Sequence, residues 1–202
     1  MPDTPDLTAL LGARICHDLI SPLGAIGNGV ELLMMTGAAV SPEIALIAES
    51  VANAHARIRY FRVAFGIASA EQRMGRPEIT SILSDISKGG RLVYDWAVPG
   101  DLPRREVKLA FLLLQCCETA MPYGGRISVS RDKGQWHLHA TAQRMKIDAG
   151  LWEELSNPRA TPAISAAQVQ FLLVPEEARR QGRRLVSEVR SDTTRSDIIL
   201  QF

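Results

Sequence analysis

Residues 4–37, TPDLTALLGARICHDLISPLGAIGNGVELLMMTG, predict one long helix. Thr4 suits its N-cap, Pro5 its first turn, and Gly37 its end. At 100° per residue, one arc of roughly 100° collects a regular row of apolar side chains. They recur at the three- and four-residue spacing of a bundle seam, at Leu11, Ile15, Leu19, Pro22, Ile26, Val30 and Leu33. The stretch therefore predicts a helix of about 30 residues, roughly 45–50 Å long, with one continuous apolar seam.

One histidine, His17, faces away from that seam, roughly 190° from its centre. Its neighbours on the same face are small or polar: Ala13, Ser21, Gly24 and Asn28. An imidazole can act as a nucleophile near neutral pH without prior activation. An exposed helical histidine is more often only a solvated residue. Here, however, the helix near His17 contains several residues that destabilise a helix. Its glycines cost about 1 kcal/mol each relative to alanine, and Pro22 costs more. Such a helix indicates a surface that is kept open or bent around His17 for a function.

A second helix is predicted from Ser41-Pro42-Glu43 to about Ala68, where apolar residues continue at a 3.6-residue period. Two long helices joined by a short link form an antiparallel hairpin. Such a hairpin cannot bury its seam by itself, so we expect a second copy to complete a four-helix bundle in a homodimer.

Four polar residues of the second helix are predicted to have structural rather than functional roles. His55 falls in its apolar arc and is predicted to be a packed core histidine. Arg57, Arg59 and Arg62 are predicted to form a solvated face.

Composition excludes several classes of protein. The 202 residues carry a net charge of +1 and 46% hydrophobic residues, so neither nucleic acid nor a membrane surface is an expected partner. The apolar run Leu109–Leu114 is too short to span a bilayer, and the N-terminus lacks the basic region of a secretory signal. The three cysteines form no CxxC pair, which predicts reduced thiols and a cytoplasmic location. His137 and His139 alternate along one predicted strand, but no third ligand accompanies them, so no metal site is expected.

After a linker at Ser69–Pro77 the pattern predicts helices mixed with strands. The expected order is a helix at about 78–88, a strand at 91–98, a helix at 104–121, strands at 126–131 and 135–143, a helix at 165–181, and a hairpin of 183–189 with 197–201. The fold class is therefore α+β. Residues 1–70 form a helical-hairpin dimerisation domain in this scheme, and residues 76–202 form a two-layer α/β sandwich.

The segment ICHDLISPLGAI resembles the phosphoacceptor motif of dimeric histidine kinases: a histidine, an acidic and an apolar residue, and a proline five positions after the histidine. The helical hairpin is similar to that family's dimerisation domain. The segment LAFLLLQCCETAMPYGGRISV resembles the helix, Gly-Gly and strand of its ATP-binding domain. In order, the resemblance covers nearly the whole chain.

The departures from the kinase pattern concern the nucleotide. Gln115 and Thr119 stand where the kinases carry two asparagines that hold ATP and its magnesium. The strand at 136–144 lacks the Asp-x-Gly-x-Gly loop, and residues 163–167 lack the second glycine-rich loop. Backbone approach to phosphates needs residues without a Cβ and free helix N-terminal amides. We therefore expect a nucleotide-binding fold without a nucleotide site, and no ATP cofactor.

The combination resembles the dimeric histidine phosphotransferases of alphaproteobacterial phosphorelays. That resemblance implies that His17 takes a phosphoryl group from the receiver domain of a hybrid histidine kinase and passes it to response-regulator receiver domains. Magnesium would be held by the receiver's acidic pocket, with no ligand from this chain.

Four residues are expected to support His17. Ser21 and Asn28 are expected to contact the receiver, and Arg14 either screens phosphate charge or is merely solvated. Asp18, one position after His17, is not expected to face the same way. Asp18 either forms a hydrogen bond to nearby groups of its own helix or assists the phosphotransfer chemistry.

Two other functions stay open at this stage: a divergent ATP-dependent histidine kinase, and a non-enzymatic dimeric scaffold in which His17 is incidental. Labelling by ATP would favour the first. Failure to accept phosphate from a receiver would favour the second.

Overall fold

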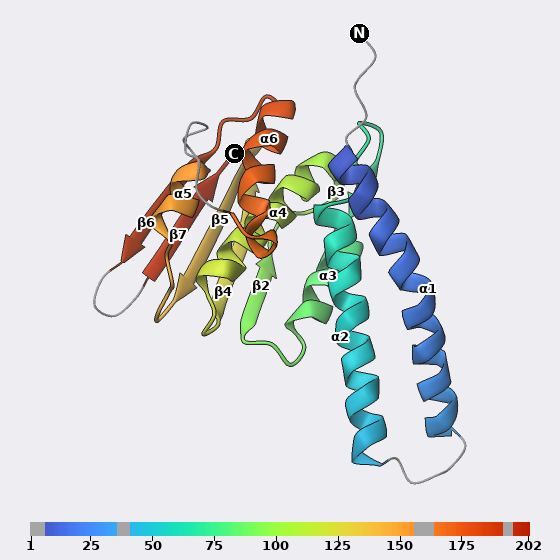
Figure 1. The fold of residues 1–202 in the computed structure, drawn as a ribbon. Coiled ribbons are helices and arrows are strands. Elements are labelled where there is room, and N and C mark those ends of the chain that lie inside the picture. Colours follow the sequence, from blue (N-terminus) through green and yellow to red (C-terminus); the bar gives the residue numbers. More distant parts are fainter. Residues whose placement is uncertain (1–6, 36–40, 156–163, 192–195) are drawn as a thin grey trace.

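The computed structural model describes residues 7–35, 41–155, 164–191 and 196–202. The first two helices, α1 (Leu7–Met35) and α2 (Pro42–Ala64), form an antiparallel hairpin beside a layer of helices and strands (Figure 1). The predicted start of α2 is confirmed, since the hydroxyl of Ser41 accepts a hydrogen bond from the Ile44 amide at 3.4 Å. The predicted ends of α1 at Thr4 and Gly37 lie outside the described residues.

The hairpin packs through a different face of α1 from the predicted seam. Cys16 is buried, and Gly12 lies so close to α2 that a Cβ there would meet the Phe65 carbonyl oxygen at 2.9 Å. Of the predicted seam, Val30 is buried as well. The large residues of the predicted seam are instead 46% to 62% exposed in the single chain, at Leu11, Ile15, Leu19, Ile26 and Leu33. The apolar seam is therefore left open by the fold of one chain.

The sheet is mixed and has five strands in the order β2-β4-β5-β7-β6. Only the β2–β4 pair is parallel. The strands are β2 (Leu92–Trp96), β4 (Gly125–Asp132), β5 (Gln135–Ala142), β6 (Val186–Ser191) and β7 (Ser196–Gln201). The predicted strands and both predicted hairpins are confirmed. A further small pair, β1 (Arg73–Gly75) with β3 (Asp101–Pro103), was not predicted, because three-residue strands carry no measurable alternation.

The helices gather on one side of the sheet (Figure 1). They are α3 (Arg76–Ser87), α4 (Arg104–Ala120), the short α5 (Ala149–Glu154), the 3₁₀ turn η1 (Ala166–Gln168) and α6 (Gln170–Arg180). Helix α5 was not predicted. Helix α4 is buried along almost its whole length, because it lies among the sheet, α6 and α2. The α+β class with a helix-covered mixed sheet is confirmed.

The C-terminal half of α2 belongs to the same core as the sheet. Tyr60 is fully buried, and its hydroxyl donates to the Phe111 carbonyl at 3.4 Å. Arg57 pairs with Glu118 of α4 at 2.9 Å, and Arg59 pairs with Asp85 of α3 at 2.8 Å. Arg57 and Arg59 are 47% and 36% exposed, so the predicted solvated face holds in part, but helical periodicity did not reveal their ion-pair partners far away in the sequence. Within the described ranges, no helix is both long and apolar enough to cross a membrane.

Candidate functional site

The side chain of His17 is 83% exposed on α1, in agreement with the predicted open face. One ring nitrogen has a partner, since Nδ1 lies 3.1 Å from Oδ1 of Asp18. A proton on Nδ1 donates to that carboxylate, and this tautomer leaves the lone pair of Nε2 directed outward. The ring is thus both reachable and oriented.

Asp18 connects His17 to Arg14. Its Oδ2 accepts a hydrogen bond from Arg14 Nε at 2.7 Å, one helical turn before. The hydrogen bond from His17 and then that from Arg14 lower the pKa of Asp18, so the carboxylate stays ionised well below neutral pH. Of the two roles expected for Asp18, the local bond is confirmed, because its carboxylate bonds both His17 and Arg14. The two Cα–Cβ bonds diverge by 100°, but rotation of the side chains brings the carboxylate back to the ring.

A groove with a volume of about 440 Å³ runs beside His17. One wall is α1, through Ala13, His17 and Ile20. The other wall is formed by the end of α2, the segment after it, and the first residues of β1, α3 and α4. Three arginines line it, namely Arg62, Arg73 and Arg104, together with the carboxylate of Glu78. The spacing of the arginines in the sequence did not identify this groove, because its residues come from six segments of the chain.

The predicted supporting residues occupy different places. Ser21 is exposed one turn after His17 but does not line the groove. Asn28 lies farther along α1 and lines a separate cavity of about 310 Å³ between the two helices. His55 lines that same cavity and is only partly buried, so its predicted place in the core was wrong for the single chain. In the part of the chain that the structure describes, no group of three histidine, cysteine, aspartate or glutamate side chains could hold a metal.

Helix α4 carries the two positions that replace the asparagines of the kinases. Gln115 is 7% exposed, and Thr119 donates to its carbonyl at 3.0 Å. The same threonine hydroxyl accepts a hydrogen bond from Nε2 of Gln170, on α6, at 3.0 Å. Ser165, before η1, forms a capping box with Gln168. The Thr119 hydroxyl and the Ser165 and Gln168 side chains therefore bond within the fold, whereas Nε2 of Gln115 is buried and has no hydrogen-bond partner among the described residues.

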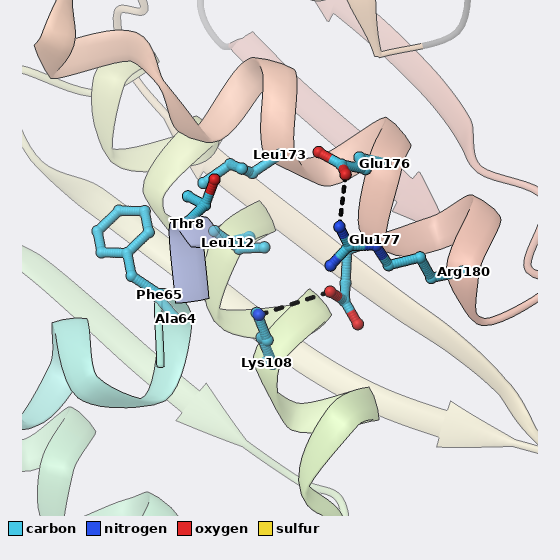
Figure 2. Close-up of a pocket in the computed structure, with 9 residues that line it drawn as sticks. All are labelled: Thr8, Ala64, Phe65, Lys108, Leu112, Leu173, Glu176, Glu177 and Arg180. Atoms are coloured by element: carbon cyan, nitrogen blue, oxygen red, sulfur yellow. Dashed lines mark hydrogen bonds and ion pairs between the residues drawn. The ribbon is translucent and has the colours of Figure 1, made fainter. Parts of the chain in front are cut away.

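Figure 2 shows the cavity where α4, α6 and the hairpin meet. The start of α1 contributes Thr8, and the end of α2 contributes Phe65. Lys108 pairs with Glu177 across it at 3.6 Å. Its volume of about 10 Å³ corresponds to a single water molecule.

The fold and the histidine-bearing hairpin define a class of phosphotransfer proteins, and comparison agrees with this. The family model of the histidine phosphotransferase C-terminal domain matches residues 76–193, and the chain belongs to this family. This chain is 40% identical over 182 residues to the protein phosphotransferase ChpT of Brucella abortus (strain 2308). The aligned region covers 86% of this chain and 87% of that relative. The protein is therefore a histidine phosphotransferase.

One solved structure shows the same fold over its whole length. A bacterial phosphotransferase superimposes with a TM-score of 0.67 and 26% identity over 99% of both chains. The histidine kinase AdeS of Acinetobacter baumannii is a weaker match, with a TM-score of 0.41 and 11% identity over 92% of this chain and 96% of the kinase. A likeness that weak says nothing about activity.

Proposed function

We propose that the protein carries a phosphoryl group on Nε2 of His17 between receiver-domain aspartates, accepting it from a hybrid histidine kinase and delivering it to response regulators. The observation that supports this most directly is the exposed imidazole whose Nδ1 is held by Asp18. The relative named a protein phosphotransferase supports the same class of reaction.

The transfer requires little from the protein besides geometry and charge. The lone pair of Nε2 attacks phosphorus and forms an N–P bond, while the bond between phosphorus and the acyl oxygen breaks and leaves the donor's carboxylate. The proton stays on Nδ1, so the phosphorylated ring becomes cationic. The ionised Asp18, 3.1 Å from Nδ1, stabilises that positive charge. Magnesium belongs to the acidic pocket of the receiver, with no ligand from this chain.

We propose that the protein uses no ATP. The positions of the kinase asparagines are occupied by Gln115 and Thr119, and Thr119 already bonds Gln170 of the facing helix. Helices α4 and α6 also pack directly against each other, and both observations argue against a triphosphate between these helices.

We also propose that two chains pair through the open seam of α1 to form a four-helix bundle. Leu11, Ile15 and Leu19 are 46% to 62% exposed along one face, a larger apolar stripe than a monomer usually leaves in water. In this scheme residues 1–70 are the dimerisation and phosphotransfer unit, and residues 76–202 are the degenerate ATP-binding fold. The three described cysteines are free and buried, which suits a reducing cytoplasm.

The test is phosphoryl transfer to purified protein. A radiolabelled phosphorylated receiver domain from a hybrid kinase is expected to label the wild type and not His17→Ala. His139→Ala is the matched control, because its side chain is also partly exposed, at 46%, but lies on β5 away from the hairpin. The proposal fails if the wild type stays unlabelled, or if labelled ATP by itself phosphorylates the protein.

A further inference from the structure

The groove beside His17 concentrates positive charge in a protein that is almost neutral. Three guanidinium groups line it, with Glu78 as the only carboxylate among the described lining residues, although the whole chain has a net charge of +1. A phosphoryl group carries about −1.5 to −2 charges near neutral pH, and guanidinium groups match its oxygens in charge and geometry. The groove thus complements the group that His17 receives.

Two of the three arginines already have structural partners. Arg104 donates from Nη2 to the Arg62 carbonyl at 2.8 Å, from Nε to the Ile67 carbonyl at 3.2 Å, and from Nη1 to the sulfur of Met74 at 3.1 Å. Arg73 donates to the Asp101 carbonyl at 2.6 Å. These hydrogen bonds hold the end of α2 and strand β1 in position. Arg73 and Arg104 therefore have a structural role in the wall of the groove that faces α1.

Arg62 differs from both. Its backbone carbonyl is held by Arg104, but within the described residues its side chain makes no hydrogen bond or ion pair. The positive charge of Arg62 acts on residues of both walls of the groove. Burial raises the pKa of Cys16, the residue before His17, and Arg62 partly offsets that rise. Burial also lowers the pKa of Arg104, and Arg62 is the second cause of that decrease. An unpaired guanidinium that is repelled by a neighbouring arginine is stabilised by an anion.

We propose that Arg62 binds the non-bridging oxygens of the phosphoryl group as it moves to and from Nε2 of His17, and so speeds transfer in both directions. This proposal rests on the proposed function, because it needs His17 as the acceptor. The N–P bond forms as the bond to the donor's leaving atom breaks, and Arg62 neutralises charge on the equatorial oxygens without exchanging a proton. The predicted solvated role of Arg62 would then be incomplete.

Potassium phosphoramidate, a small phosphoryl donor, tests Arg62 without any protein partner. Nε2 of His17 displaces ammonia from phosphorus, and phosphohistidine is followed over time by ³¹P NMR on the full-length protein. Arg62→Gln is expected to slow labelling about tenfold to a hundredfold, the worth of a hydrogen bond to a charged group. Arg62→Lys is expected to restore most of the rate, because it keeps the charge. Added salt is expected to slow the wild type more than Arg62→Gln.

Arg126→Gln is the matched control, since Arg126 is exposed on β4 and does not line the groove. It is expected to label like the wild type. The outcomes separate the two proposals: labelling that needs His17 but is unchanged in Arg62→Gln overturns the role of Arg62 only, whereas a wild type that is not labelled overturns both. An equal loss in Arg62→Gln and Arg62→Lys indicates a structural role and also overturns the Arg62 proposal.

Discussion

Glu118 joins the hairpin to the sheet layer, and replacing it tests how firmly the two are held together. Its Oε1 accepts a hydrogen bond from the Tyr94 hydroxyl at 2.6 Å, and its Oε2 accepts one from Arg57 at 2.9 Å. The side chain is only 13% exposed. Burial, and then the charge of Glu118, raise the pKa of Tyr94, so the phenol stays protonated and donates throughout the physiological range.

We expect Glu118→Ala to lower the free energy of unfolding by about 2 kcal/mol. The short bond from Tyr94 to a carboxylate contributes about 1.5–3 kcal/mol. The pair with Arg57 adds about 0.5 kcal/mol, because the arginine is 47% exposed and screened by water. Removing a carboxylate that is largely withdrawn from water offsets part of this loss. For a chain of this length, the melting temperature should fall by about 4–8 °C.

Urea unfolding followed by circular dichroism measures this change, at one fixed protein concentration because dimer formation would couple to stability. Glu176→Ala is the control, since its pair with Arg180 leaves the glutamate 46% exposed, and it should stay within about 0.5 kcal/mol of the wild type. A Glu118→Ala protein as stable as that control would refute the account of this junction.

Three further predictions concern the seam, the histidine pair and a turn. Leu19→Glu should convert the dimer to a monomer in size-exclusion chromatography with light scattering, whereas Leu172→Glu, on α6 and equally exposed at 46%, should stay dimeric; a monomeric wild type would contradict the bundle. Asp18→Asn should slow phosphorylation of His17 about tenfold, because the stabilising charge is lost. Since the pKa of Asp18 is lowered, its carboxylate is ionised throughout the range from about pH 8 to 9, so that factor should stay constant there, and a factor that varies in this range would argue against the assignment. Gly124→Ala should cost about 2 kcal/mol in urea unfolding, because φ is +94° and the new Cβ would lie 2.5 Å from a backbone carbonyl; an unchanged midpoint would show that the turn can relax.

The sequence was sufficient for features that depend on neighbouring residues. The start of α2 at Ser41-Pro42, the length of α4 and the β4–β5 hairpin follow from caps, periodicity and turn residues, which act over a few positions. The exposure of His17 was predicted for the same reason, since the residues that share its helical face are small or polar.

Only the tertiary structure decided which distant groups meet. Arg57, Arg59 and Arg62 look alike in the sequence, yet the fold pairs the first two with Glu118 and Asp85 and leaves the third in the groove beside His17. Periodicity reports the direction of a side chain from its own helix. Which partner the side chain meets depends on segments tens of residues away in the sequence. It also depends on side-chain torsions, such as those that bring the Asp18 carboxylate to the His17 ring. The sequence thus determined the reactive histidine and its open surface, whereas packing determined the charged surroundings in which that histidine works.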